Sequence, residues 1–301
     1  MPNASKRNNL ILRDKLASKI REYFHEAGFV EVHTPVRLQN AALEDYIDAI
    51  PSGTGWLRTS PEIHMKQMLA DGFEKIFQLG PCFRANESGQ RHRQEFYMLE
   101  WYEINKTYKD LLNFTTDMMR FLSKSVLNSQ SITYQTNQID LSIDPEIINV
   151  SDAFKNYGGC SVEEAIKNNQ YEIVLCDQVE PALAKDRLVY LKDYPESEAA
   201  MAVINNHGIA ERWELYACGI ELANCYTELN DPEEQRQRFL QSAELRSNDE
   251  RDVYNLDETF LNKLADMPPA SGCALGFDRL VMLFSDSPDI NQVNAFPDEL
   301  N

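Results

Sequence analysis

Long strand-like runs, adjacent in sequence and interleaved with single helices, constrain the fold of this 301-residue chain most. Phe96–Ile104 has the character of a long strand, and Trp213–Ala217 and Ile220–Glu228 are two strands joined at Cys218-Gly219. Strands joined by a tight turn pair antiparallel. We therefore expect an α+β fold, with an antiparallel β-sheet flanked by helices, rather than a parallel α/β sheet.

The remaining elements are predicted from apolar periodicity and from capping residues. Further strands are expected at 29–33, 56–59, 75–79 and 188–191. Helices are expected at 10–27 with Gly28 as C-cap, at 108–127, after the capping box of Ser161 and Glu164, from Asp231-Pro232 to about Arg246, and from Gly276 through Phe284. Tyr157-Gly158-Gly159 is predicted to be a loop. Residues 130–190 carry the weakest pattern.

Composition limits the function classes. The 48 acidic residues exceed the 29 basic ones, giving a net charge of −19. Nucleic-acid binding draws most of its affinity from Lys and Arg on phosphates, so a large tRNA-binding surface is not expected. No apolar run approaches the about 18 residues of a membrane span, and the N-terminus lacks a secretory signal, so we expect a cytoplasmic protein. The six cysteines form no C-x-x-C pair and read as reduced thiols without a zinc site.

The loop between Phe83 and Phe96 gathers cationic side chains. Arg84, Arg91, His92 and Arg93 lie within ten residues. Guanidinium groups bind phosphate oxygens in a bidentate way, so this loop is suited to a polyanion such as a triphosphate. A solvated surface hairpin would give the same charge run, and both interpretations stay open.

The strand that follows sets a carboxylate among large side chains. Alternation places Phe96, Met98, Glu100 and Tyr102 on one face of the strand. A carboxylate in such surroundings needs a cationic partner, because its desolvation is costly. The partner is either a structural ion pair or the ammonium group of a substrate.

Acidic side chains recur in the second hairpin. Asn224, Tyr226 and Glu228 share one strand face. Glu221 has the opposite parity, so it needs either a bulge or a different neighbour. Several carboxylates in an apolar hairpin suggest a site for Mg²⁺, for an amine or for both. An edge hairpin with solvated carboxylates is the alternative. In the last segment, 271–279, glycines allow close backbone approach to a ligand, or form a tight structural turn.

Taken in order, three segments resemble the signature motifs of class II aminoacyl-tRNA synthetases. Residues 28–35 resemble motif 1, residues 83–96 motif 2, and residues 272–279 motif 3. Within that family, residues 59–66, 95–102 and 219–224 are similar to lysyl-tRNA synthetases. They are closer still to their short paralogs, the elongation factor P (R)-β-lysine ligases. The resemblance covers about residues 10–285.

The resemblance implies a domain organisation and a substrate. Residues 1–301 are expected to form a single catalytic domain with no anticodon-binding domain, because motif 1 begins within the first thirty residues. Motif 1 lies at the dimer interface in the family, so a homodimer is expected. Ala274 stands where the synthetases usually have glycine and the paralogs have alanine, which favours (R)-β-lysine over lysine.

Residue roles follow from the resemblance alone. Arg84 and Arg279 are the expected catalytic residues, with Arg84 on the α-phosphate and the substrate carboxylate. The expected ATP-binding residues are Arg84, Asn86, Glu87, His92, Arg93, Phe96, Glu221, Leu222, Gly276 and Arg279. Glu214 and Glu221 would hold Mg²⁺. The amino-acid pocket would be formed by Ser60, Pro61, Glu62, Glu100, Tyr102, Asn224, Tyr226, Glu228 and Ala274.

The implied reaction is acyl transfer in two steps. ATP and an amino acid give an aminoacyl-adenylate, and a lysine side chain of elongation factor P then accepts the aminoacyl group. Two alternatives stay open: a truncated lysyl-tRNA synthetase that charges tRNA, and a non-catalytic paralog that binds an amino acid or ATP. The second alternative predicts the loss of the ATP arginines, yet Arg84 and Arg279 are both present.

Overall fold

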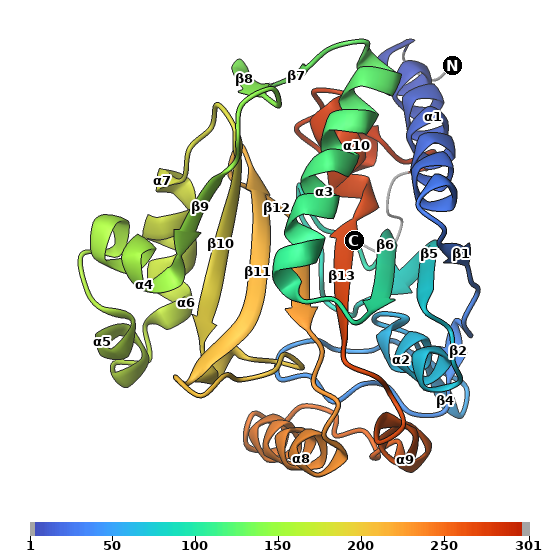
Figure 1. Cartoon of the computed structure of the whole chain (residues 1–301), viewed down its shortest axis with the longest axis vertical. Helices are drawn as coiled ribbons and strands as arrows, with labels where there is room; N and C mark the ends of the chain where they lie inside the picture. Colours follow the sequence, from blue (N-terminus) through green and yellow to red (C-terminus); the bar gives the residue numbers. More distant parts are fainter. Residues whose placement is uncertain (1–3, 297–301) are drawn as a thin grey trace.

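The computed structural model describes residues 4–296, and a large sheet forms its centre (Figure 1). In this part of the chain the sheet has eight strands. In sheet order they are β1 (Val30–Glu31), β5 (Lys75–Phe83), β6 (Glu95–Ile104), β13 (Ala270–Gly276), β12 (Ile220–Thr227), β11 (Ile209–Ala217), β10 (Leu188–Pro195) and β9 (Glu146–Asn149). The strands from β5 to β10 pair antiparallel, and only β1 and β9 pair parallel with their neighbours. The expected α+β class is confirmed, with a parallel strand at each edge.

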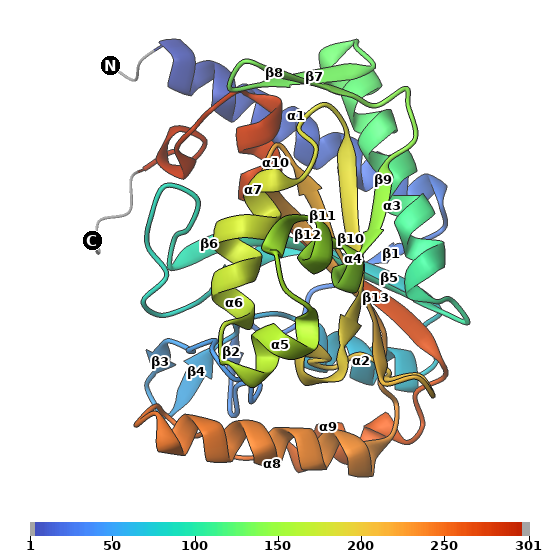
Figure 2. The ribbon, with the colours of Figure 1, turned by 90° about the vertical axis from the view of Figure 1, so that its left-hand side faces the viewer.

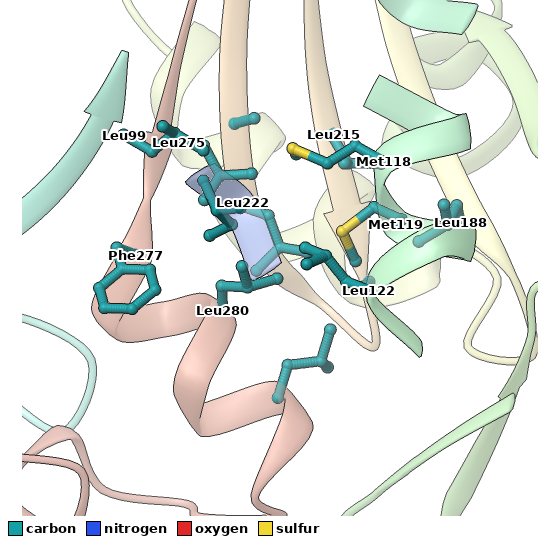
Figure 3. Close-up of a cluster of buried hydrophobic side chains, with 14 of the residues drawn as sticks. Leu99, Met118, Met119, Leu122, Leu188, Leu215, Leu222, Leu275, Phe277 and Leu280 are labelled. Carbon is teal, nitrogen blue, oxygen red and sulfur yellow. The ribbon is translucent and has the colours of Figure 1, made fainter. Parts of the chain in front are cut away.

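One face of the sheet is covered by α1 (Ala4–Glu26), α3 (Tyr108–Leu122) and α10 (Phe277–Phe284). Met118, Met119 and Leu122 of α3 meet Leu215 and Leu222 of the sheet in the main hydrophobic core, and Figure 3 shows the helix of Phe277 and Leu280 beside them. The helix α3 has its apolar residues along one side, as expected for a helix that covers a sheet. These helices pack on β6, β12 and β13 and support the face of the sheet opposite the cavity.

The other face is covered only at its borders. A helical segment lies over β10 and β11: α4 (Val150–Ala153), η2 (Phe154–Gly158), α5 (Val162–Lys167), α6 (Tyr171–Val174), η3 (Leu175–Val179) and α7 (Glu180–Ala182). At one end of the sheet lie α2 (Glu62–Ala70), α8 (Pro232–Asn248) and α9 (Glu258–Leu264), which form a second core (Figure 2). Between these borders the side chains of β6, β12 and β13 line a cavity.

The smaller elements close the fold. A three-stranded sheet contains β2 (Arg37–Leu38), β4 (Gly55–Leu57) and β3 (Pro51–Ser52), and a hairpin pairs β7 (Ser131–Tyr134) with β8 (Asn137–Asp140). Single turns of helix occur at η1 (Ser123–Leu127), η4 (Glu196–Glu198) and η5 (Ile290–Gln292). Within residues 4–296, no helix combines the length and the hydropathy needed to cross a membrane.

Most predicted elements are confirmed. The strand expected at 56–59 is shorter, as β4 (Gly55–Leu57), and two other elements need correction. The predicted strand 29–33 contains only Val30–Glu31, because beyond Val32, whose N–H donates to Phe77, the chain leaves β5. The predicted loop at Tyr157-Gly158-Gly159 is instead largely a π-helical turn, η2. Gly158 is buried against Val174, and a Cβ at this position would lie only 2.6 Å from Cγ1 of Val174, so the packing requires glycine. Gly159 ends the turn with φ +67°.

The register of the sheet places polar residues in rows. Across β5, β6, β13, β12 and β11, one row runs through Gln78, Glu100, Ala274, Asn224 and Glu214. Between β11 and β12 the register shifts, because Leu215 pairs with Ala223 while Tyr216 pairs with Glu221. That bulge carries Glu221 to the same face as the row, as its parity required.

Candidate active site

A cavity of about 300 Å³ lies on the face of the sheet opposite α3. Seventeen of the residues expected to bind ATP, the amino acid or a metal line it: Ser60, Glu62, Arg84, Glu87, His92, Arg93, Phe96, Glu100, Tyr102, Glu221, Leu222, Asn224, Tyr226, Glu228, Ala274, Gly276 and Arg279. The structure thus brings residues from five separate segments together. Asn86, Pro61 and Glu214 lie outside the lining.

Glu100 lies at the bottom of the cavity on β6. It is 1% exposed and accepts hydrogen bonds from the hydroxyls of Ser60 at 3.0 Å and Tyr102 at 2.6 Å. Burial, followed by the charge of Glu62, raises the pKa of Glu100 to about 8. Because both of its partners are neutral hydroxyls, no protein cation offsets the ionised form of Glu100, and a cation that enters the cavity would stabilise that form.

Lys66, which the sequence interpretation did not place in the site, lies beneath the carboxylates. It is fully buried on α2, and its Nζ lies 2.6 Å from Glu62 Oε1 and 2.6 Å from Glu228 Oε2. Burial alone would lower the pKa of Lys66, but Glu228 and Glu62 raise it. One buried ammonium therefore partly neutralises two cavity carboxylates and fixes their positions. The sequence does indicate the pair of Lys66 with Glu62, because Lys66 follows Glu62 by four residues, about one turn of a helix.

Gly272 leaves the space that the side chains of Tyr102 and Glu228 occupy in the cavity wall. On β13 it lies between Tyr102 of β6 and Tyr226 of β12. A Cβ at this position would lie 2.2 Å from Cε1 of Tyr102 and 2.3 Å from Oε1 of Glu228. Real side chains do not approach so closely, so only glycine allows this arrangement of Tyr102 and Glu228.

The opposite end of the cavity is cationic. Arg84 lies over the ring of Phe96 with its Cζ 5.2 Å from the ring centroid, and it faces Glu87 at 3.7 Å. The Nε atoms of Arg84 and Arg93 are buried and lack a hydrogen-bond partner within residues 4–296. Guanidinium groups with free donors in a cavity fit the phosphates of a nucleotide.

Arg279 joins motif 3 to the motif 2 loop. Its guanidinium donates to the Glu221 backbone carbonyl at 2.9 Å and side chain at 3.1 Å, and it lies 2.5 Å from Nε2 of His92. Burial, followed by the charge of Arg279, lowers the pKa of His92. Arg91 fastens the same loop by donating to the carbonyl of Gly219 at 2.7 Å. The loop thus closes over the cavity from the side of β12.

The three predicted residues outside the lining have clear structural positions. Asn86 adopts a left-handed backbone with φ 64°, which asparagine tolerates better than most residues, and it forms the turn after Arg84. Pro61 is the N-cap of α2 and directs Glu62 toward the cavity. Glu214 lies on β11, beyond Asn224 on the same face of the sheet, and its own contacts within the protein account for its place outside the cavity lining.

Glu214 is already fully bonded within the protein. Its Oε1 accepts from Arg212 at 2.5 Å, and its Oε2 accepts from Tyr194 at 2.6 Å and Tyr216 at 2.7 Å. Glu221, in contrast, lines the cavity near the cationic loop. Among residues 4–296, no group of three His, Cys, Asp or Glu side chains is arranged to hold a metal ion by itself. Of the two carboxylates expected to hold Mg²⁺, only Glu221 lines the cavity, and its side chain pairs with Arg279 at 3.1 Å.

Comparison with known proteins agrees with this geometry. The family described as tRNA synthetases class II (D, K and N) matches residues 1–300. The elongation factor P--(R)-beta-lysine ligase of Haemophilus influenzae (strain PittGG) is 35% identical over 96% of this chain and 94% of its own length. The ligase of that name from Hamiltonella defensa is 34% identical over 97% of this chain and 95% of its own.

A lysine--tRNA ligase of Staphylococcus epidermidis is 32% identical over 98% of this chain, which spans 65% of that protein. A family match over nearly all of the sequence, a cavity lined by residues of the motif 2 and motif 3 segments, and an eight-stranded sheet with an antiparallel centre agree with one another. This chain belongs to the class II tRNA synthetase family of the D, K and N enzymes.

Proposed function

We propose that this chain is an ATP-dependent ligase that activates (R)-β-lysine, or lysine, as an aminoacyl-adenylate. The observation that carries the proposal is the division of one cavity into a cationic end and an anionic end. ATP and the substrate carboxylate would bind at the arginines. A diamino acid would extend its two ammonium groups toward the buried carboxylates, which few other amino acids could satisfy.

The side chains suggest how the first step proceeds. Arg84 would orient the substrate carboxylate and the α-phosphate for in-line attack, and Arg279 would hold the far end of the nucleotide. Phe96 would lie against the adenine. When bound with the phosphates, Mg²⁺ would neutralise part of their charge, and Glu221 is the residue placed to touch it. Positioning and charge stabilisation account for most of the catalysis in phosphoryl chemistry of this kind.

The proposal for the acceptor of the second step rests on the names of the relatives. Two relatives that match nearly the full length of this chain are named as ligases of elongation factor P and (R)-β-lysine. We propose the same acceptor, a lysine side chain of elongation factor P, and a homodimer formed through the segment 28–35. The reaction belongs in the cytoplasm, where ATP and the translation factor are found.

Transfer to tRNA is the second candidate, because a lysine--tRNA ligase matches 98% of this chain at 32% identity. Against it stands the net charge of −19, which weakens attraction to an RNA backbone.

The deciding experiment measures the intact mass of elongation factor P after incubation with this protein, ATP, Mg²⁺ and (R)-β-lysine, with lysine tRNA in a parallel reaction. We expect the mass of the factor to rise by one lysyl unit while the tRNA stays uncharged. Charged tRNA with unmodified factor would establish the synthetase activity instead. No product in either reaction would contradict the ligase and favour a non-catalytic amino-acid-binding paralog.

A further inference from the structure

Glu44 contributes a carboxylate to the cavity from outside the three motifs. Its backbone is held by Arg246, a fully buried residue of α8 that donates to the carbonyls of Glu44 at 2.7 Å and Ile47 at 2.9 Å. Arg246 also donates to Asp48 at 2.7 Å. A loop fixed in this way by a buried guanidinium holds its side chains in defined positions.

The cavity carboxylates differ in their protein partners. Glu62 and Glu228 share the ammonium of Lys66. Glu44 receives only a long hydrogen bond of 3.4 Å from the hydroxyl of Thr59, and no ion pair joins it to a cation among residues 4–296. Glu100 likewise receives only hydroxyls. Glu44 and Glu100 are therefore the two carboxylates of the wall that lack a protein cation in the described chain.

Glu44 lies toward the cationic end, whereas Glu100 lies deeper. The N–H of Ala85, next to Arg84, donates to the carbonyl of Asp48 at 2.8 Å, which places this loop beside Arg84. The pKa of Glu44 is raised to about 7 by burial, lowered in part by Arg84 and raised again by Glu62. Burial and the charge of Glu62 also raise the pKa of Glu100.

A carboxylate in this position would repel a substrate carboxylate held at Arg84. The repulsion is removed when the substrate carries an ammonium one or two carbons from its carboxylate. Lysine carries one on Cα and β-lysine on Cβ, and both carry a second ammonium at the far end. Two carboxylates without protein cations, one near Arg84 and one deep in the cavity, match two ammonium groups spaced along one chain.

We propose that Glu44 binds the substrate ammonium nearest the substrate carboxylate, so that it sets the specificity for a diamino acid. This inference rests on the proposed function, because it requires that a diamino acid occupies the cavity. It assigns to the loop 44–48 a part in substrate selection that none of the three motifs contains.

The test compares Glu44→Gln with Asp45→Asn, a matched removal of the neighbouring carboxylate in the same loop. Asp45 is exposed and accepts from Ser242 at 2.5 Å. ATP–pyrophosphate exchange would give KM for lysine, for β-lysine and for ATP. We expect Glu44→Gln to raise KM for both amino acids about 10- to 100-fold with KM for ATP changed less than about 3-fold, as for loss of a charged hydrogen bond. Asp45→Asn should match the parent protein.

A second readout uses 6-aminohexanoate, which has the distal ammonium and lacks the proximal one, as a competitor of lysine. Glu44→Gln should leave its inhibition constant unchanged or lower it. Equal rises in KM for ATP and for the amino acids would assign Glu44 to the support of Arg84 and overturn the proposal, and unchanged constants would overturn it as well. If the parent protein shows no exchange with either lysine isomer, it is the proposed function that fails.

Discussion

The two ends of the cavity are built in different ways. The carboxylates Glu100 and Glu228 stand on or beside the central strands, are nearly fully buried, and are fixed by hydroxyls and by Lys66. The cations Arg84, His92 and Arg93 follow β5 on a loop whose residues are largely exposed or half-exposed. The anionic end is thus preorganised by the sheet, whereas the cationic end is carried by a loop.

This difference suggests how the two substrates are selected. A buried carboxylate is costly without a cation, so the anionic end favours a ligand that brings ammonium groups. Arginines on a loop can adjust to the long polyphosphate and can close over it. Recognition of the distal ammonium of the amino acid then depends on the rigid end, and catalysis of the phosphate chemistry depends on the loop.

The largest effect is expected from Arg84→Ala at the cationic end. Arginines on transferred phosphoryl groups contribute about a thousandfold or more to the rate, so ATP–pyrophosphate exchange should fall below detection. Thermal unfolding should change little, because Arg84 is partly exposed. Arg187→Ala, which removes an exposed arginine paired with Asp186, is the control and should retain full exchange. If Arg84→Ala still catalyses exchange, Arg84 and the cationic end of the cavity are not required for adenylate formation.

The next effect concerns stability at the anionic end. Lys66→Met leaves two buried carboxylates without their shared cation, and loss of one member of a buried pair costs about 3–5 kcal/mol. Denaturant unfolding would measure the free energy. Lys75→Met removes a more exposed ammonium 2.9 Å from Glu103 and should cost no more than about 1 kcal/mol. Equal stability of the two variants would mean that Lys66 does not fix the anionic end.

Glu100→Gln should separate the two ends kinetically. The variant keeps the shape of the side chain but removes the carboxylate that would bind the substrate ammonium. KM for lysine should therefore rise about 10- to 100-fold. KM for ATP should stay within about 3-fold, because the nucleotide binds elsewhere in the cavity. Glu103→Gln, on the same strand with opposite parity, is the control. A rise of KM for ATP that equals the rise for lysine would erase the distinction between the two ends.

The smallest effect is expected from pH. The pKa values of Glu44, at about 7, and Glu100, at about 8, are raised by burial, so both groups lose protons between pH 6 and pH 8. KM for lysine should therefore fall several-fold across this range. The folded protein binds more protons than the unfolded chain there, so the free energy of unfolding without substrate should decrease as pH rises. A flat KM profile would show that these carboxyls do not bind the substrate.

Local pattern predicted the parts of the site that lie on regular strands. Alternation with a period of two placed Glu100 with Tyr102 and Asn224 with Tyr226 on one face, and the structure confirms both pairs in the cavity wall. The odd parity of Glu221 called for either a bulge or a different neighbour, and the structure has the bulge, between β11 and β12. The fold class followed from the same strands.

Other features depend on contacts that no local pattern specifies. Glu44 reaches the cavity from a loop held by Arg246, about two hundred residues away in sequence. Glu214 shares a strand face with Arg212, which occupies it, and this pairing was not anticipated. Residues 130–190 were weakly patterned because they form four-residue strands (β7, β8 and β9) and then short helices broken by π-helical turns, all too short to show a clear period.

The most direct test of the division into two ends is ATP–pyrophosphate exchange with (R)-β-lysine, lysine and norleucine. Norleucine has the same carbon skeleton as lysine and lacks the distal ammonium. We expect exchange with both lysine isomers and a rate at least about a thousandfold lower with norleucine, because Glu100 would remain without a cation. Exchange with norleucine at the rate of lysine, or no exchange with any of the three, would contradict the account.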